Sequence, residues 1–208
     1  MISRPEASTR HRRQRGISLI IVLILLIAAV FLGASAAGIA LMSEKAASGD
    51  RDRQTALQAA EAVLIDAERD IDTAPGTTAV PRTFAFSDKS AIGFPAPDDT
   101  FGCNTSPDSS NWGLCKRAPV NETDTWLAVD LTSTAVSVPY GYFTGQKLPV
   151  GSGALPSKLP RYIIELMPYN QPGGDAGHPI KFYRITAIGF GMRSETQVVV
   201  QSYYLKGE

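Results

Sequence analysis

Residues 10–42 read RHRRQRGISLIIVLILLIAAVFLGASAAGIALM, a basic cluster followed directly by a long uncharged run. The uncharged run covers residues 17–42, which are 26 residues. As an α-helix it would extend about 39 Å at about 1.5 Å per residue, and a hydrocarbon core is about 30 Å thick. The run is therefore long enough to span a membrane once. Because positive charge before a span stays in the cytoplasm, we expect everything after Met42 to be exported.

Charge is divided unevenly along the chain. Residues 1–16 carry five arginines against Glu6, a net charge of +4, and the remaining residues carry 15 basic and 19 acidic side chains, a net charge of −4. Binding to nucleic acid requires clustered lysine and arginine, so a mildly acidic exported part argues against a nucleic-acid partner. The arginines before the apolar run are explained by membrane topology instead.

The two cysteines, Cys103 and Cys115, lie in the segment FGCNTSPDSSNWGLC. An even number of cysteines in an exported protein favours a disulfide. A zinc site would need two further ligands, and the only histidines are His11, before the apolar run, and His178. We therefore predict a Cys103–Cys115 disulfide and no metal.

The apolar run has three interpretations: a plain signal anchor, a cleaved secretory signal, and a helix that stays on the mature chain after a cut that precedes it. Ala34-Ser35-Ala36 has the small-x-small pattern that a signal peptidase accepts. Against cleavage there, apolar residues continue to Met42 and a helical pattern resumes soon afterwards. The third interpretation places the cut after Gly16.

Apolar residues recur at intervals of three and four between residues 54 and 72, which is one stripe of an α-helix. We expect charged residues, Asp52 and Asp66 among them, to lie on the opposite face. Proline is absent from residues 17–72, so one helix of 56 residues is expected, apolar all round in its first half and amphipathic in its second. The residues expected to pack on the rest of the protein are Leu57, Ala60, Leu64, Ala67 and Ile71, with Ala56 and Val63 alongside them.

Residues 73–208 are sufficient for one compact domain, which we call the head. Up to about residue 158 prolines interrupt every longer run, and only short strands are expected, at residues 83–86, 126–131 and 136–138. Three later segments are rich in β-branched and aromatic residues and predict an antiparallel meander, namely residues 161–167, 180–188 and 196–205.

These patterns predict an α+β fold, with a long N-terminal helix packed on an antiparallel β-sheet. One face of the sheet, carrying either Phe182, Arg184, Thr186 and Ile188 or Tyr183, Ile185 and Ala187, is expected to pack on the apolar stripe. The chain is expected to divide into a basic leader (1–16), a membrane half of the helix (17–42), an amphipathic half (43–72) and the head (73–208).

No catalytic arrangement is evident in the sequence. A Ser-His-Asp site would need a histidine in the exported part, and His178 lies in a PGGDAGHP loop. Gly173-Gly174-Asp175 lacks the lysine of a phosphate-binding loop, and no EF-hand spacing surrounds Asp98-Asp99. We expect neither enzymatic activity nor a cofactor.

The leader and the residues after it resemble a known processing signal. A short basic segment ending in Gly16 and followed by ISLIIVL is similar to the class III signal of type IV pilins and pseudopilins. By that resemblance a prepilin peptidase cuts after Gly16, and Ile17 becomes the N-methylated amino terminus of the mature chain.

A second block resembles, more narrowly, the PilX-type minor pilins. It consists of Glu44 and Lys45, the RDR of residues 51–53 and the AxQAAEA of residues 56–62, with looser matches at Gly113-Leu114-Cys115, Trp126 and residues 184–189. The resemblance implies a non-enzymatic pilus subunit with a pilin-like fold. Its implied partners are other minor and major pilins, prepilin peptidase, a tip adhesin and, before assembly, inner-membrane lipid.

Ile21 departs from the common pilin pattern. Most pilins place a glutamate five residues into the mature chain, and in the family's usual picture that carboxylate neutralises the amino terminus of a neighbouring subunit. A buried ammonium without a partner is costly, whereas a subunit with nothing above it has no such amine to meet. PilX-type pilins and their type II secretion counterparts share the missing glutamate, which implies a position at the fibre tip.

The function expected from the sequence is a minor pilin that primes and caps a type IV pilus. The chain would cross the inner membrane once with a periplasmic head, and later reside in the extracellular fibre. Two alternatives are a type II secretion tip pseudopilin, which usually has a larger and more helical head, and a signal-anchored periplasmic binding protein or hydrolase, which would need a pocket with convergent polar groups. Gly33 and Gly38 fit either local unwinding or close helix packing during assembly.

Overall fold

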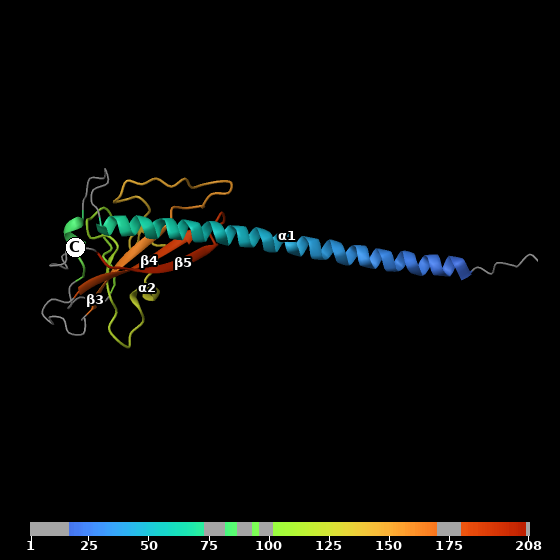
Figure 1. The fold of residues 1–208 in the computed structure, drawn as a ribbon, viewed down its shortest axis with the longest axis horizontal. Helices are drawn as coiled ribbons and strands as arrows, with labels where there is room; N and C mark the ends of the chain where they lie inside the picture. The colour runs from blue at the N-terminus through green and yellow to red at the C-terminus, as the bar shows by residue number, and fades with distance from the viewer. Residues whose placement is uncertain (1–16, 73–81, 87–92, 96–101, 170–179, 207–208) are drawn as a thin grey trace, which may run out of the picture. The chain divides into compact units, whose positions relative to one another are not determined.

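A computed structural model describes residues 17–72, 82–86, 93–95, 102–169 and 180–206. The chain separates into two compact units, Met1–Ser48 and Gly49–Glu208. One element, helix α1 (Ile17–Asp72), contributes residues to both units and is helical over all 56 residues (Figure 1). The predicted leader, including Gly16, lies outside the described residues.

In the first unit, the described side chains of residues 18–48 are all exposed. The sequence favours a helix here because long runs of Leu, Ile and Ala are uninterrupted by proline. α1 stays helical through Gly33 and Gly38, and the space beside each of these glycines is open. In the structure of this single chain, neither glycine unwinds the helix.

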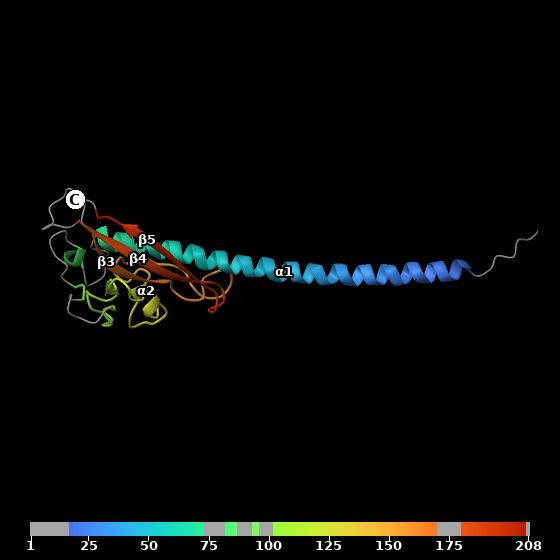
Figure 2. The same cartoon turned by 90° about the horizontal axis from the view of Figure 1, so that it is seen from below.

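The second unit contains a five-stranded sheet. Its strands are β1 (Leu114–Lys116), β2 (Val138–Pro139), β3 (Arg161–Tyr169), β4 (Ile180–Phe190) and β5 (Gln197–Tyr204). They pair in the order β1-β3-β4-β5, and β2 also pairs with β3. β3, β4 and β5 are consecutive antiparallel strands, as Figure 2 shows, so the predicted meander is confirmed.

The earlier part of the head differs from the sequence prediction. Thr83–Phe86 is a 3₁₀ helix, η1, and not a strand. The prediction of a strand at residues 126–131 is wrong, because the short helix α2 (Thr125–Ala128) begins there, after Asp124. Trp126 and Val129 both pack against one apolar cluster, which includes Cys115 and Leu131. The sequence did not predict β1, because a strand of three residues is too short to show an alternating pattern. β1 forms through its pairing with β3.

The two faces of β4 belong to two apolar clusters. Tyr183, Ile185 and Ala187 pack in one core with helix residues Val63 and Ala67. Ile188 and Phe190 pack in a second cluster that includes Cys115, Leu131 and Ile163. The α+β fold is therefore confirmed, with the face that carries Tyr183 packed on the helix.

The buried face of α1 contains most of the predicted stripe but is displaced away from Leu57 and Leu64. Ala60, Ala67 and Ile71 are fully buried, but Leu64 is only partly buried and Leu57 is 37% exposed. Ala56 and Val63, which were expected alongside the stripe, are also fully buried. The displacement follows from close backbone packing, since alanines rather than leucines face β4 where the strand crosses the helix.

Gly189 allows this close approach. A Cβ atom at residue 189 would collide with the carbonyl oxygen of Ala56 and the amide nitrogen of Ala60. These are backbone atoms of α1, so they cannot rotate away as a side chain could. Only glycine lets β4 lie against the helix at this point.

We expect Gly189→Ala to destabilise the head by about 3 kcal/mol, at the upper end of ordinary overpacking, because backbone atoms must move. The measurement is urea unfolding of the full chain in detergent, monitored by tryptophan fluorescence. Gly49→Ala is the matched control, because the space beside this helical glycine is open, and it should raise stability by up to about 1 kcal/mol. Equal stability of Gly189→Ala and the natural chain would contradict the close approach.

Candidate functional site

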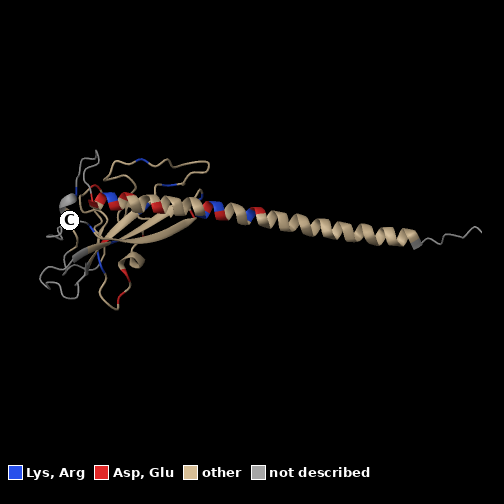
Figure 3. Ribbon diagram, in the orientation of Figure 1, with Lys and Arg blue, Asp and Glu red and all other residues tan. Residues whose placement is uncertain are grey.

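The apolar part of α1 is the first candidate functional surface. Figure 3 shows α1 without Lys, Arg, Asp or Glu until Glu44 and Lys45. Its large apolar side chains between Leu19 and Met42 are 45–76% exposed. Within the described residues it is the one helix apolar and long enough to cross a membrane, with a mean hydropathy of 3.0 over its most apolar window. Such a surface requires lipid or other apolar helices around it.

The predicted processing and assembly residues lie at the start of this helix. Ile17 is the first residue of α1, whereas Gly16 lies outside the described residues. Ile21 is 52% exposed and forms part of the continuous apolar surface. Over residues 18–42 this surface carries no side-chain charge that could neutralise an amine.

The second candidate is a set of three buried carboxylates that join α1 to the head. Asp52, Asp66 and Asp70 are each at most 3% exposed. Asp52 and Asp66 were expected on the solvent face of the helix, and that prediction is wrong. Their spacings of 14 and 4 residues put all three on one helix face, together with Ala56 and Val63. The helical spacing of these aspartates is visible in the sequence. Their charge, however, wrongly predicted that they would be exposed to solvent.

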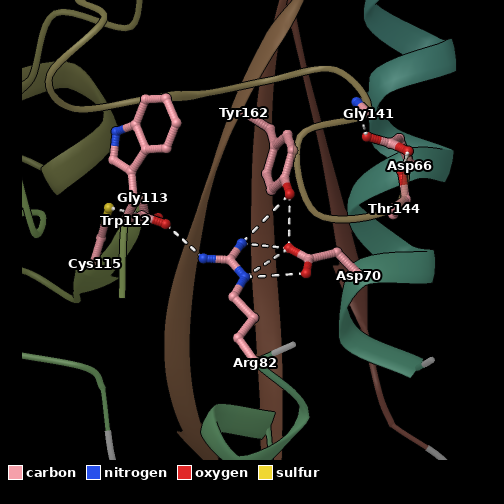
Figure 4. A network of polar contacts seen from close by, with 9 residues as sticks. All are labelled: Asp66, Asp70, Arg82, Trp112, Gly113, Cys115, Gly141, Thr144 and Tyr162. Carbon is pink, nitrogen blue, oxygen red and sulfur yellow. Dashed lines mark hydrogen bonds and ion pairs between the residues drawn. The ribbon is translucent and has the colours of Figure 1, made fainter. Parts of the chain in front are cut away.

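Asp70 forms the most extensive of these connections (Figure 4). The Nε atom of Arg82 donates to both carboxylate oxygens of Asp70, at 3.0 and 2.9 Å, and Nη2 donates to Oδ2. Tyr162, on β3, donates its hydroxyl to the same oxygen at 2.7 Å. Arg82 also donates to the carbonyl oxygen of Trp112 at 2.5 Å. One guanidinium therefore ties α1 to β3 and to the segment before β1.

Burial and the neighbouring carboxylate shift the pKa of Arg82 in opposite directions. Burial alone would lower its pKa, but the Asp70 carboxylate raises it overall, so the ion pair stays charged. The guanidinium also lies 3.8 Å from the ring centroid of Phe143. Burial and the Asp70 charge raise the pKa of Tyr162 well above its ordinary value, so its hydroxyl remains a donor.

Asp66 holds the loop after β2. It accepts hydrogen bonds from the amide of Gly141, at 2.7 Å, and from the hydroxyl of Thr144. Burial raises the pKa of Asp66, and these two bonds oppose the rise. Gly141 has a φ of 75°, in the left-handed region that glycine tolerates.

Asp52 holds the turn between β4 and β5. It accepts from the Thr196 hydroxyl at 2.6 Å, from Nε of Arg193 at 2.8 Å and from the Arg193 amide at 3.2 Å. The Thr196 bond contributes most to lowering the pKa of Asp52 to about 2. The three aspartates thus fix three separate head segments along one helix face.

The far side of the sheet has its own polar and covalent contacts. Arg184 donates two hydrogen bonds of 2.8 Å to the buried carboxylate of Glu165, its register partner on β3. The predicted Cys103–Cys115 disulfide is present. Backbone bonds beside the disulfide, such as Asn104 N to Leu114 O at 3.0 Å, pair the two cysteine segments and position β1.

The buried polar groups of the head bond to one another and to the backbone. Among the described residues, no group of three or more His, Cys, Asp or Glu side chains could hold a metal ion. Asp98-Asp99, Gly173–Asp175 and His178, weighed earlier as ligands or catalysts, lie outside the described residues. The buried carboxylates of Asp52, Asp66, Asp70 and Glu165 are all engaged by donors from the chain itself.

We expect Asp70→Asn to destabilise the head by about 3–5 kcal/mol, because it leaves the Arg82 charge buried without its partner. The double variant Asp70→Leu/Arg82→Met removes both charges and should recover most of that loss. Urea unfolding of the full chain in detergent measures both variants. Additive losses in the double variant would contradict a coupled pair.

Two family profiles match the chain. The profile described as type IV pilus assembly protein PilX, C-terminal part, covers residues 103–206, and the PilX N-terminal profile covers residues 15–64. No curated protein and no solved structure shows a significant match. The two profiles together cover the apolar helix, most of its amphipathic continuation and all five strands of the head. The chain belongs to the PilX family and is a minor pilin that acts in type IV pilus assembly.

Proposed function

We propose that this minor pilin primes pilus assembly and occupies the fibre tip, where its head contacts other minor pilins or a tip adhesin. The observation that carries the proposal is Ile21. An apolar side chain stands where most pilins have the carboxylate that meets a neighbour's amino terminus. A subunit of this kind fits where no subunit lies above it.

Processing and membrane insertion come before assembly in this proposal. Prepilin peptidase removes the leader after Gly16, and Ile17 becomes the methylated amino terminus. The apolar segment, residues 18–42, then holds the chain in the inner membrane with the head in the periplasm. Its uncharged, exposed surface supports this step, since no side-chain charge has to enter the hydrocarbon region.

Assembly moves the apolar segment from lipid into a bundle of pilin helices. Lipid tails are as apolar as the helices, so close packing supplies the gain rather than the hydrophobic effect. Gly33 and Gly38 support close packing, because α1 is helical at both positions and the space beside each is open for another helix. This favours the packing role of these glycines over local unwinding.

The aspartate contacts support a role for the head as a rigid block. Asp52, Asp66 and Asp70 connect the Gly49–Asp72 part of α1 to three segments of the head. A head held at three levels cannot turn independently about that part of the helix. Its contact surface would therefore be presented in one orientation to the next subunit.

We expect Ile21→Glu to release the subunit from the tip. The new carboxylate could neutralise the amino terminus of a subunit above, so the variant should also appear along the fibre shaft. Gold labelling of an epitope tag on the head, viewed by electron microscopy, gives the number and position of copies per fibre. The expected result is one terminal cluster for the natural chain and several positions for the variant.

Ile21→Leu is the control, because it keeps the position apolar and should leave the label at the tip. Labelling of the natural chain along the shaft would contradict the tip position. So would Ile21→Glu labelling confined to the tip.

A further inference from the structure

Among the residues that the structure describes, nothing gives the outer edge of β5 the protection that a long strand edge usually has. β5 has eight residues, QVVVQSYY, and contains no charge, proline or glycine. Within the described sheet it pairs only with β4 and ends the strand order. Natural proteins usually protect such an edge with charges, proline, bulges or a covering segment, because bare edges recruit other strands.

The pairing register shows which backbone groups point outward. Gly191 donates to the carbonyl oxygen of Thr196 at 2.8 Å, and this pair continues the β4–β5 register. Antiparallel strands alternate between residues bonded to the neighbour and residues that face away. The residues of β5 that turn their N–H and C=O groups away from β4 are therefore Gln197, Val199, Gln201 and Tyr203.

The side chains along this edge suit an apolar neighbour. Val199 is 43% exposed and Tyr203 is 63% exposed on the sheet face away from α1. On the other face, Ser202 and Tyr204 donate hydrogen bonds to Glu68 and Asp72 of α1.

We propose that the outer edge of β5 accepts an extended strand from a second, different subunit of the pilus. The N–H and C=O groups that face away from β4 specify an extended segment rather than a helix. The uncharged edge and the exposed Val199 and Tyr203 specify alternating uncharged, apolar residues in that segment. The inference rests on the proposed function, since it requires neighbouring pilus subunits.

The direction of β5 argues against a second copy of this chain as the occupant. Thr196, just before β5, bonds Asp52, and Tyr204 near its end bonds Asp72, so β5 runs in the same direction as α1. Two copies whose Gly49–Asp72 helix segments run in the same direction would present their β5 edges in the same direction. They could pair only in parallel, which is the less stable ladder.

The test places a benzophenone-bearing residue, one position at a time, at 197, 199, 201 and 203 of the full-length protein in piliated cells. After irradiation, mass spectrometry locates each adduct on the partner. The expected result is a ladder, with successive probes mapping to sites about two residues apart in one segment of one other pilus subunit. Adducts scattered over several surfaces, adducts on a second copy of this chain, or no adducts would overturn the proposal.

A matched pair of variants tests the backbone contact. Gln201→Pro removes one outward N–H and leaves the β4 ladder intact, whereas Gln201→Ala keeps that N–H. Both lose the side-chain bond from Gln201 to Thr186. We expect the adduct yield from position 199 to fall at least about fivefold in the proline variant and to be unchanged in the alanine variant. Equal yields would overturn the proposal.

Two controls separate folding and the proposed function from the edge contact. Formation of the Cys103–Cys115 disulfide and thermal unfolding report whether the Gln201→Pro variant folds. If it does not fold, the adduct ladder from the benzophenone-bearing proteins without the proline substitution decides. Normal piliation after deletion of the gene would refute priming. Piliation that depends on the gene, without an adduct ladder, would refute the edge contact alone.

Discussion

Helix α1 has to satisfy two different surroundings along one unbroken run of backbone hydrogen bonds. Residues 18–42 expose apolar side chains all round and carry no charge. Residues from Asp52 onward bury one face against the sheet and leave the other exposed. The absence of proline and the choice of alanine, rather than bulkier residues, at the buried positions make both possible in one element. In the proposed function, anchoring, assembly and presentation of the head all depend on this continuity.

The contact between α1 and the head combines small residues with buried charge. Gly189, Ala56 and Ala60 bring two backbones close together, which leaves little room for large side chains. The aspartates then specify which head segment meets each turn of the helix, because every carboxylate requires donors from one place. Apolar packing alone would tolerate small shifts along the helix, whereas a buried carboxylate displaced from its donors is costly.

Much of this architecture was readable in the sequence, and the errors have physical causes. The length of α1 and the β3-β4-β5 meander follow from proline placement and from runs of β-branched and aromatic residues. Within the predicted stripe, Ala60, Ala67 and Ile71 are buried, whereas Leu57 and Leu64 are less buried than expected because close backbone packing favours alanine. Asp52 and Asp66 were assigned to solvent because the arginine, threonine and glycine that satisfy them lie 75–144 residues away. Short elements such as β1 and α2 depend on tertiary partners and show no local period.

The most direct test of this account is the amino terminus of the mature protein recovered from membranes and from sheared pili. The account predicts that intact-mass and N-terminal peptide analysis will find a chain that begins at N-methylated Ile17 and retains the whole of α1. A mature chain that begins at Ala37, after Ala34-Ser35-Ala36, would have lost the apolar segment and would contradict it.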